Sequence, residues 1–204
     1  AAAMAGKPLE QRKANAARRA IEQQINTIAL FGNTAYNLPG FLTNANVPSA
    51  SVDADGTGAT TTWSTKTPDQ IVRDMNDLPN GIVTLTKGTE IPTTMLLPLE
   101  QFTLVSSTRM GDGSDTTILK FFLENNPFIR EVDWVNELNG AGPAGVDIFV
   151  AYKRDPDALT LEIPQDFEQL PVQEVGLEFV VNCHARIGGT IIYYPLSVSI
   201  GEGI

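Results

Sequence analysis

The sequence predicts an α+β protein, and three observations lead to that class. Residues 8–31 repeat apolar side chains at helical spacing, residues 67–152 alternate short helical and short strand patterns, and residues 159–200 are rich in β-branched and aromatic side chains. The chain has 204 residues, of which 42% are apolar. That is enough for one sizeable core or two small ones, and it excludes disorder as the main state.

The first predicted element is one long amphipathic helix over residues 8–31. No glycine or proline interrupts it after Pro8, which suits a first helical turn, and Gly32 with Asn33 provides a left-handed stop. The apolar positions of its repeat are Leu9, Ala17, Ile21, Ile25 and Ile28. At about 1.5 Å per residue the helix would be about 36 Å long, which is more than a small domain needs.

Residues 32–66 read as a long connection rich in Gly, Pro, Asn, Thr and Ser, with a short strand at 50–52. Within it, Asp53, Asp55 and Gly56 resemble the opening of a calcium-binding loop. The closing glutamate of such a loop is missing, so we expect a plain turn.

The middle of the chain alternates between helix and strand. Thr67-Pro68-Asp69-Gln70 is typical of a capping box and predicts a helix that ends at Pro79-Asn80-Gly81. The further predicted elements are strands at 82–86 and 93–97, a short helix from Pro98, a polar loop at 109–115 and a helix over 116–126.

The last third of the chain reads mainly as strands. They are expected at 128–135, 146–152, 159–163, 175–183 and 190–200. Pro195 divides the last of these, so we expect the chain to bend there from one sheet into another.

Composition excludes several function classes. Acidic residues outnumber basic ones 24 to 14, for a net charge of −10, which argues against a nucleic-acid groove as the main surface. A single cysteine, Cys183, and a single histidine, His184, cannot supply an internal disulfide or most zinc and triad sites. No apolar run is long enough to span a membrane.

The sequence shows no convincing catalytic motif. A phosphate-binding P-loop and a Gly-x-Ser-x-Gly elbow are both absent. The carboxylate pairs Glu162 with Asp166 and Glu174 with Glu178 are expected by chance among 24 acidic residues. We therefore expect that the protein is not an enzyme, that it has no catalytic or metal-binding residue, and that it binds no cofactor.

Basic charge is concentrated at the start of the chain, on Lys7, Arg12, Lys13, Arg18 and Arg19. The rest of the chain is strongly acidic. This asymmetry fits either a solvated helix face or a surface that steers self-association between copies of the chain.

Several segments of the sequence resemble, in the same order, segments of the major capsid proteins of tailed phages and prophages with the Hong Kong 97 fold. The matching stretches are EQRKANAARRAIEQQIN (10–26), ALFGN (29–33), GFLTNANVP (40–48), TPDQIVRDMN (67–76), LLPLEQFTLVSST (96–108), TTILKFFLENNPF (116–128), the run 150–198, and the closing GEGI. The resemblance covers nearly the whole chain.

The resemblance implies a peripheral domain, with a long spine helix and a β-sheet, made of residues 1–45 and 157–193. It implies an axial domain, a central sheet flanked by helices, made of residues 46–156 and 194–204. The loops 109–115 and 139–145 would meet at the capsomer centre. The candidate subunit-interface residues are accordingly Arg12, Lys13, Arg18, Arg19, Arg109, Asp112 and Asn139.

The implied function is that of a structural head protein, which self-assembles as pentamers and hexamers into an icosahedral shell around double-stranded DNA. The shell would contact its DNA without sequence specificity and could bind portal, scaffold or decoration proteins. Its place would be the virion, after assembly in the bacterial cytoplasm, with no membrane partner. Family members carry an N-terminal arm and an extended loop before the spine helix, so we expect this chain to be a fragment of a longer subunit.

Two alternatives stay open at this point. The same fold serves encapsulin-like compartments that enclose an enzyme cargo, and one sequence does not separate them from phage shells. A small hydrolase built on clustered carboxylates would instead require a concave site with strongly shifted acids.

Overall fold

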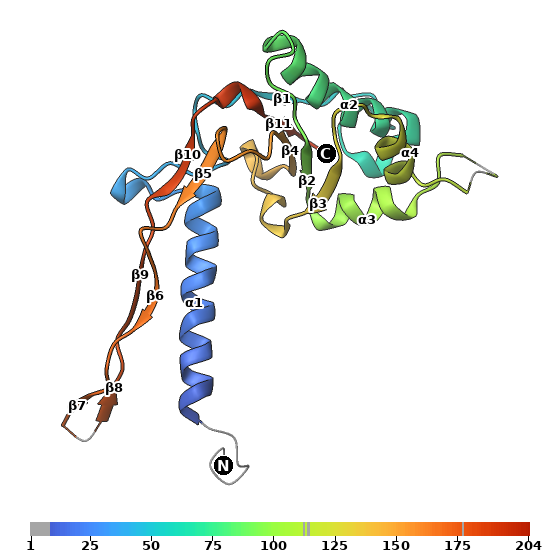
Figure 1. Cartoon of the computed structure of the whole chain (residues 1–204). Coiled ribbons are helices and arrows are strands. Elements are labelled where there is room, and N and C mark those ends of the chain that lie inside the picture. Colours follow the sequence, from blue (N-terminus) through green and yellow to red (C-terminus); the bar gives the residue numbers. More distant parts are fainter. Residues whose placement is uncertain (1–8, 112, 114, 177) are drawn as a thin grey trace. The chain divides into compact units, whose positions relative to one another are not determined.

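A long helix, α1 (Leu9–Phe31), begins the described part of the chain (Figure 1). The computed structural model describes residues 9–111, 113, 115–176 and 178–204, with side chains from residue 12 onward except 178 and 179. The expected stop of α1 is confirmed, since Gly32 adopts the left-handed φ of 73°. The chain then turns back, and Phe41 N–H donates to the Ala29 carbonyl over 2.8 Å.

The connection that follows holds little regular structure, as expected. It contains the short strand β1 (Ser49–Ser51) and 3₁₀ turns at Thr34–Tyr36 and Trp63–Thr65. Trp63 is only 1% exposed, so this loop is fastened to the protein by a large apolar side chain.

Helix α2 (Pro68–Leu85) begins as the sequence predicts and ends later than predicted. Thr67 and Gln70 form the capping box, with the Thr67 N–H donating to Gln70 Oε1 over 2.7 Å. The predicted stop at Pro79 and the predicted strand at 82–86 are wrong, because the helix continues through Pro79.

Burial explains why α2 tolerates an internal proline. Ile71, Met75, Leu78 and Ile82 continue one buried stripe across Pro79. Each buried aliphatic side chain stabilises the fold by about 1.5–3 kcal/mol. This burial offsets most of the roughly 3 kcal/mol that a proline inside a helix costs. The helix ends at Leu85 in a turn where Lys87 adopts the left-handed φ of 54° and Gly88 donates its N–H to the Val83 carbonyl.

The elements from residue 94 to 152 follow the predicted order with shorter strands. They are β2 (Thr94–Leu97), α3 (Leu99–Ser107), α4 (Ile118–Asn125), β3 (Glu131–Trp134) and β4 (Ile148–Tyr152). Thr117 caps α4, accepting a hydrogen bond from the Lys120 N–H.

A five-stranded mixed sheet is the centre of this part of the chain. Its strand order is β1-β11-β4-β2-β3, where β11 is Val198–Glu202. The pairs β1–β11 and β2–β3 are parallel, and β11–β4 and β4–β2 are antiparallel. The predicted break at Pro195 is confirmed, since a 3₁₀ turn at Pro195–Ser197 separates β10 (Gly189–Ile192) from β11.

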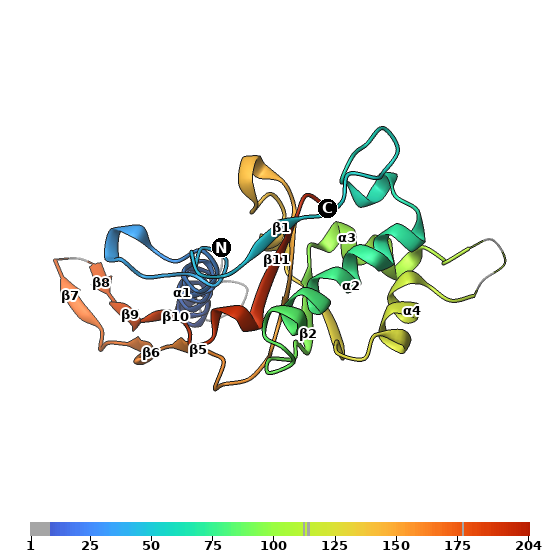
Figure 2. The same ribbon diagram turned by 90° about the horizontal axis from the view of Figure 1, so that it is seen from above.

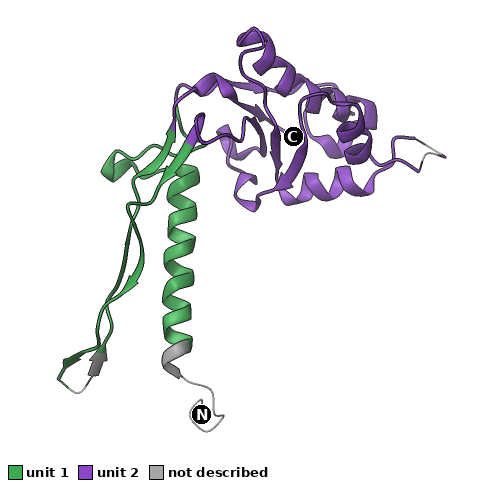
Figure 3. Ribbon diagram, viewed as in Figure 1, with its two compact units in different colours: residues 1–44, 160–191 green, residues 45–159, 192–204 purple. Residues whose placement is uncertain are grey.

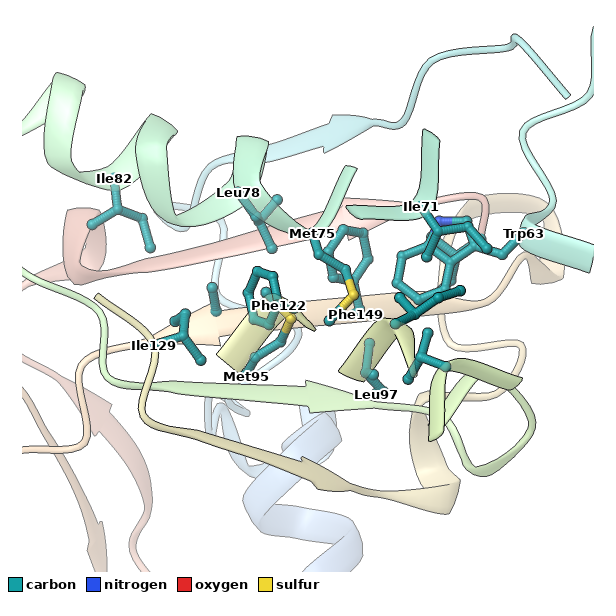
Figure 4. Close-up of a cluster of buried hydrophobic side chains, with 14 residues drawn as sticks. Trp63, Ile71, Met75, Leu78, Ile82, Met95, Leu97, Phe122, Ile129 and Phe149 are labelled. Atoms are coloured by element: carbon teal, nitrogen blue, oxygen red, sulfur yellow. The ribbon is translucent and has the colours of Figure 1, made fainter. Parts of the chain in front are cut away.

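The main core lies between this sheet and the helices α2, α3 and α4, which lie together beside it (Figure 2). Figure 4 shows Trp63, Met75, Phe122 and Phe149 pointing into one cluster, with the Trp63 and Phe149 ring centroids 5.4 Å apart. The whole cluster is Trp63, Ile71, Met75, Leu78, Ile82, Met95, Leu97, Val105, Ile118, Phe122, Ile129, Phe149, Ala151 and Ile204.

Residues 159–192 form a narrow β ribbon instead of long separate strands. β5 (Leu159–Glu162) pairs with β10. The other pairs are β6 (Gln165–Gln169) with β9 (Cys183–Arg186) and β7 (Gln173–Val175) with β8 (Glu178–Val180). The single predicted strand at 175–183 is therefore wrong, because the chain reverses direction after Val175, and β6 was not predicted.

The chain divides into two units (Figure 3). Unit 1 comprises residues 1–44 and 160–191, and holds α1 and the ribbon. Unit 2 comprises residues 45–159 and 192–204, and holds the sheet and its helices.

Candidate functional site

The basic residues predicted as interface candidates lie on different faces of α1. At 100° per residue, Arg12 and Arg19 fall on one line, while Lys13 and Arg18 point about a quarter to a third of a turn away from it. Arg12, Asn15, Ala16 and Arg19 together line a shallow surface hollow. We refer to these four residues as the basic stripe.

The basic stripe carries charge that unit 1 does not neutralise. Arg18 forms an ion pair with Glu22, with 2.9 Å between Nε and Oε1. Arg12, Lys13 and Arg19 are exposed and form no ion pair with any residue whose side chain the structure describes. Arg18 thus serves its own helix, whereas the other three cations remain available to a partner.

The opposite face of α1 is apolar and only half covered. Ala17, Ile21, Ile25 and Ile28 lie on it with intermediate burial, and no described side chain from residue 12 to residue 31 is buried. In the described part of unit 1, the buried residues are Gly40, Phe41, Gly189 and Thr190. The described side chains of unit 1 therefore form almost no hydrophobic core of their own.

The ribbon of unit 1 is acidic and exposes apolar side chains. Residues 160–191 contain five carboxylates and one arginine, Arg186. Asp166 and Glu168 are exposed on β6, and Glu168 accepts a hydrogen bond from Gln165 Nε2 and lies 3.6 Å from His184 Nε2. Valine side chains are exposed toward the ribbon's tip, at Val172, Val175 and Val181.

The remaining interface candidates belong to unit 2 loops. Arg109 is exposed and pairs through its backbone with Thr117 in an isolated bridge. Asn139 is exposed and follows a 3₁₀ turn at Asn136–Leu138. The two residues share no hydrogen bond within the described part of the chain, and Asp112 lies outside the described residues.

A buried charge network in unit 2 was not predicted. Asp74 is its centre, and the side chain is 1% exposed. Asp74 Oδ2 accepts from Lys66 Nζ over 2.5 Å and from Trp63 Nε1 over 3.1 Å, and Asp74 Oδ1 accepts from Arg73 over 2.8 Å. A signal existed in the sequence, because Asp74 lies on the apolar stripe of α2 between Ile71 and Leu78.

The calcium-like group at Asp53 and Asp55 belongs to this network. The Asp55 carboxylate forms an ion pair with Arg73, with 2.6 Å between Oδ2 and Nη1, and its Oδ1 lies 3.2 Å from Lys66 Nζ. Lys66 Nζ also donates to the Asp53 carbonyl over 2.7 Å. The hydrogen bond from Arg73 lowers the pKa of Asp55 to about 2. The chain's own cations thus neutralise this aspartate, and the network fastens the loop at 53–66 to α2.

A groove of about 310 Å³ lies between β1 and α2 beside this network. Its walls include Ala50, Val52, Leu78 and Leu85, and Asp77 lies at its margin. Partial burial raises the pKa of Asp77. The carboxylate pairs considered in the sequence lie elsewhere, on the ribbon of unit 1.

Two further observations bear on function. Within the described ranges, no three His, Cys, Asp or Glu side chains are placed to share a metal ion. None of the helices in those ranges combines the length and hydropathy that crossing a bilayer requires.

Comparison with known proteins points to one family. The family model described as major capsid protein matches residues 1–204. No curated protein sequence matches the chain.

Several solved structures resemble the chain, and three of them are capsids or virus-like particles. The capsid of Myoviridae phage XM1 matches with a TM-score of 0.84 at 15% identity, over 100% of this chain and 68% of that one. The capsid of an empty GTA particle matches with a TM-score of 0.61 at 14% identity, over 95% and 66%. A virus-like particle from Pyrococcus furiosus matches with a TM-score of 0.54 at 14% identity, over 79% and 58%. At these identities the likeness concerns the fold alone.

Proposed function

Because this chain belongs to the major capsid protein family, we propose that it acts by repeated self-association, as a shell subunit in the head of a tailed phage or prophage. The predicted α+β fold of the Hong Kong 97 type is confirmed by the full-length match to the phage XM1 capsid. The prediction of a structural virion protein is confirmed by the family and by the capsid fold.

One observation carries the proposal at the level of this chain, namely that unit 1 cannot bury its own apolar surface. A 23-residue helix without a buried described side chain and a two-stranded ribbon are both marginal in isolation. Contacts with neighbouring copies would cover the half-exposed isoleucines of α1 and the exposed valines of the ribbon. Large contacts of this kind, repeated by symmetry, hold closed shells together.

The two units correspond, in this proposal, to the two domains that the family resemblance implies. Unit 1 would be the peripheral domain with α1 as its spine helix, and unit 2 the axial domain. The loops that carry Arg109, Asp112 and Asn139 would meet at the centre of pentamers and hexamers. The basic side chains of Arg12, Lys13 and Arg19 would face neighbouring subunits, as would Arg18 together with its partner Glu22.

The acidic character of the chain fits an enclosing role. A net charge of −10 repels the phosphate backbone, so the shell would enclose double-stranded DNA without binding it tightly. Portal, scaffold or decoration proteins would bind the same shell.

A cargo compartment of the encapsulin kind, which shares the predicted fold, is the second candidate, and the chain also resembles a virus-like particle. That match has a TM-score of 0.54 over 79% of the chain, against 0.84 over the whole chain for the phage capsid. The phage shell is therefore the function we propose.

A structural role also fits the chemistry of the described residues. In the groove beside α2, Asp74 is bound by Lys66 and Arg73, and Asp77 lies 4.0 Å from Arg73. We propose that these carboxylates stabilise the fold and that the subunit catalyses no reaction.

Expression of the complete gene product tests the proposal. We expect closed particles of uniform size in electron micrographs, and a sedimentation coefficient far above that of a 22 kDa chain. Particles purified from a producing host should protect double-stranded DNA from nuclease. A protein that stays monomeric at all concentrations would refute self-association, and particles that contain an enzyme in place of DNA would favour the compartment.

A further inference from the structure

The basic stripe of α1 and the acidic β6 strand are exposed charged surfaces, and on β6 the described partners are Gln165 and His184 for Glu168 and the Phe167 N–H for Asp166. Some cations of unit 2 have carboxylate partners, as Lys153 does with Glu90 and Arg154 with Glu131. Within the described side chains, neither Arg12 nor Arg19 has an ion pair, and no lysine or arginine lies within ion-pair distance of Asp166 or Glu168. Unused charges of opposite sign on one chain are typical of surfaces that meet between copies.

The stripe cannot easily reach the ribbon of its own subunit. Helix α1 packs against β9, the partner of β6. The half-covered face of α1 carries Ile21 and Ile25, and the stripe lies on the opposite side of the helix. The β6 strand of the same subunit is therefore not placed to meet the stripe.

The two surfaces also match in size. Arg12 and Arg19 are seven residues apart, which is about 10 Å along a helix. Asp166 and Glu168 are two residues apart, at most about 7 Å along a strand, in a part of β6 where the register with β9 shifts. Long arginine side chains cover the difference. Asn15 and Ala16 lie between the arginines in the sequence and line the same hollow.

We propose that the basic stripe of α1 docks on the acidic β6 strand of a second copy of this chain, with Arg12 and Arg19 pairing with Asp166 and Glu168. The contact joins two different patches, so it is heterologous and propagates from copy to copy until symmetry closes it. The inference rests on the proposed shell function and names one of its contacts.

Complementary charge reversal tests the contact. The variants are Arg12→Glu with Arg19→Glu on the helix, and Asp166→Lys with Glu168→Lys on the ribbon. Each variant alone faces like charges at every contact, so the concentration needed for half-maximal assembly should rise about tenfold. Light scattering and electron microscopy measure the assembly, and thermal unfolding of each variant checks the fold.

Mixing the two variants separates a contact between copies from one within a chain. In an equimolar mixture, an acidic stripe can dock on a basic ribbon and a basic stripe on an acidic ribbon, so assembly should return toward the wild-type concentration. If the contact were internal to each chain, both variants would stay defective after mixing, and the proposal would be wrong. The reversal of Lys87 and Arg130 to glutamate, both exposed in unit 2, is the matched charge control.

The outcomes also separate this inference from the shell function. Single variants that assemble like the wild type would overturn the contact and leave the shell intact. A wild-type protein that forms no particle would refute the shell function itself.

Discussion

Replacement of Asp74 by asparagine should destabilise unit 2 strongly, because it removes one charge from a buried pair. The Lys66 side chain has no exposed surface, and that of Asp74 is 1% exposed. The asparagine oxygen can still accept the Trp63 indole hydrogen bond, so the change mainly removes charge. Lys66 would keep the Asp53 carbonyl and the Asp55 carboxylate as partners.

The expected cost follows from these contacts. Breaking a buried ion pair by removing one partner costs about 3–5 kcal/mol, and the remaining partners of Lys66 place this case at the lower end. A loss of about 3 kcal/mol lowers the folding equilibrium constant roughly 150-fold and the melting temperature by about 10 °C.

Urea denaturation followed by tryptophan fluorescence measures the effect. Trp63 is 1% exposed and Trp134 is 49% exposed, so Trp134→Phe leaves a single buried reporter next to the network. Asp69→Asn is the control, because Asp69 is an exposed carboxylate in the first turn of the same helix. Its loss should cost less than 1 kcal/mol.

The double variant Lys66→Met with Asp74→Leu should recover part of the stability, since it leaves no unpaired buried charge. The recovery is partial because the buried Trp63 indole N–H loses its acceptor. A loss below 1 kcal/mol for Asp74→Asn, or a loss equal to that of Asp69→Asn, would refute the argument that the buried charge holds the loop on α2.

Three further predictions concern unit 2. Gly201→Ala should cost at least 2 kcal/mol in urea denaturation, because a Cβ there would overlap the ring of Phe149 in the paired strand, and a near-neutral result would contradict that packing. Gly81→Ala should raise stability by about 0.5–1 kcal/mol in the same assay, since Gly81 lies inside α2 with open space around its Cβ position. Arg73 holds the folded pKa of Asp55 at about 2, below the ordinary 3.8, so stability from this carboxylate is present above about pH 4 and lost as pH falls toward 2. Asp55→Asn should flatten the acid side of the stability curve, and an unchanged curve would exclude this contribution.

Elements with local signals could be predicted from the sequence. The Thr67 capping box and the left-handed Gly32 formed where the sequence indicated, because each depends on residues within one or two turns. The bend at Pro195 also has a local cause, because proline has no backbone N–H to donate to a neighbouring β-strand.

Errors arose where distant contacts outweigh local preference. Pro79 and Gly81 predict a stop, but the sheet covers Leu78 and Ile82, and that burial extends the helix. The run 175–183 reads as one strand, but pairing with β6 and β7 requires a reversal inside it.

Sequence alone established the α+β class, the long basic helix, the acidic remainder of the chain and the lack of recognisable catalytic motifs. These properties are sums over residues or short repeats, so they need no knowledge of which segments meet. Tertiary structure decided that Lys66 and Asp55 neutralise each other's charge around Asp74, while Arg12 and Arg19 lie together on the face of α1 that the chain leaves bare. A charged side chain stabilises the fold when an opposite charge lies within a few ångströms of it, and otherwise it can bind a partner. For these residues the fold sets the distance to the nearest opposite charge.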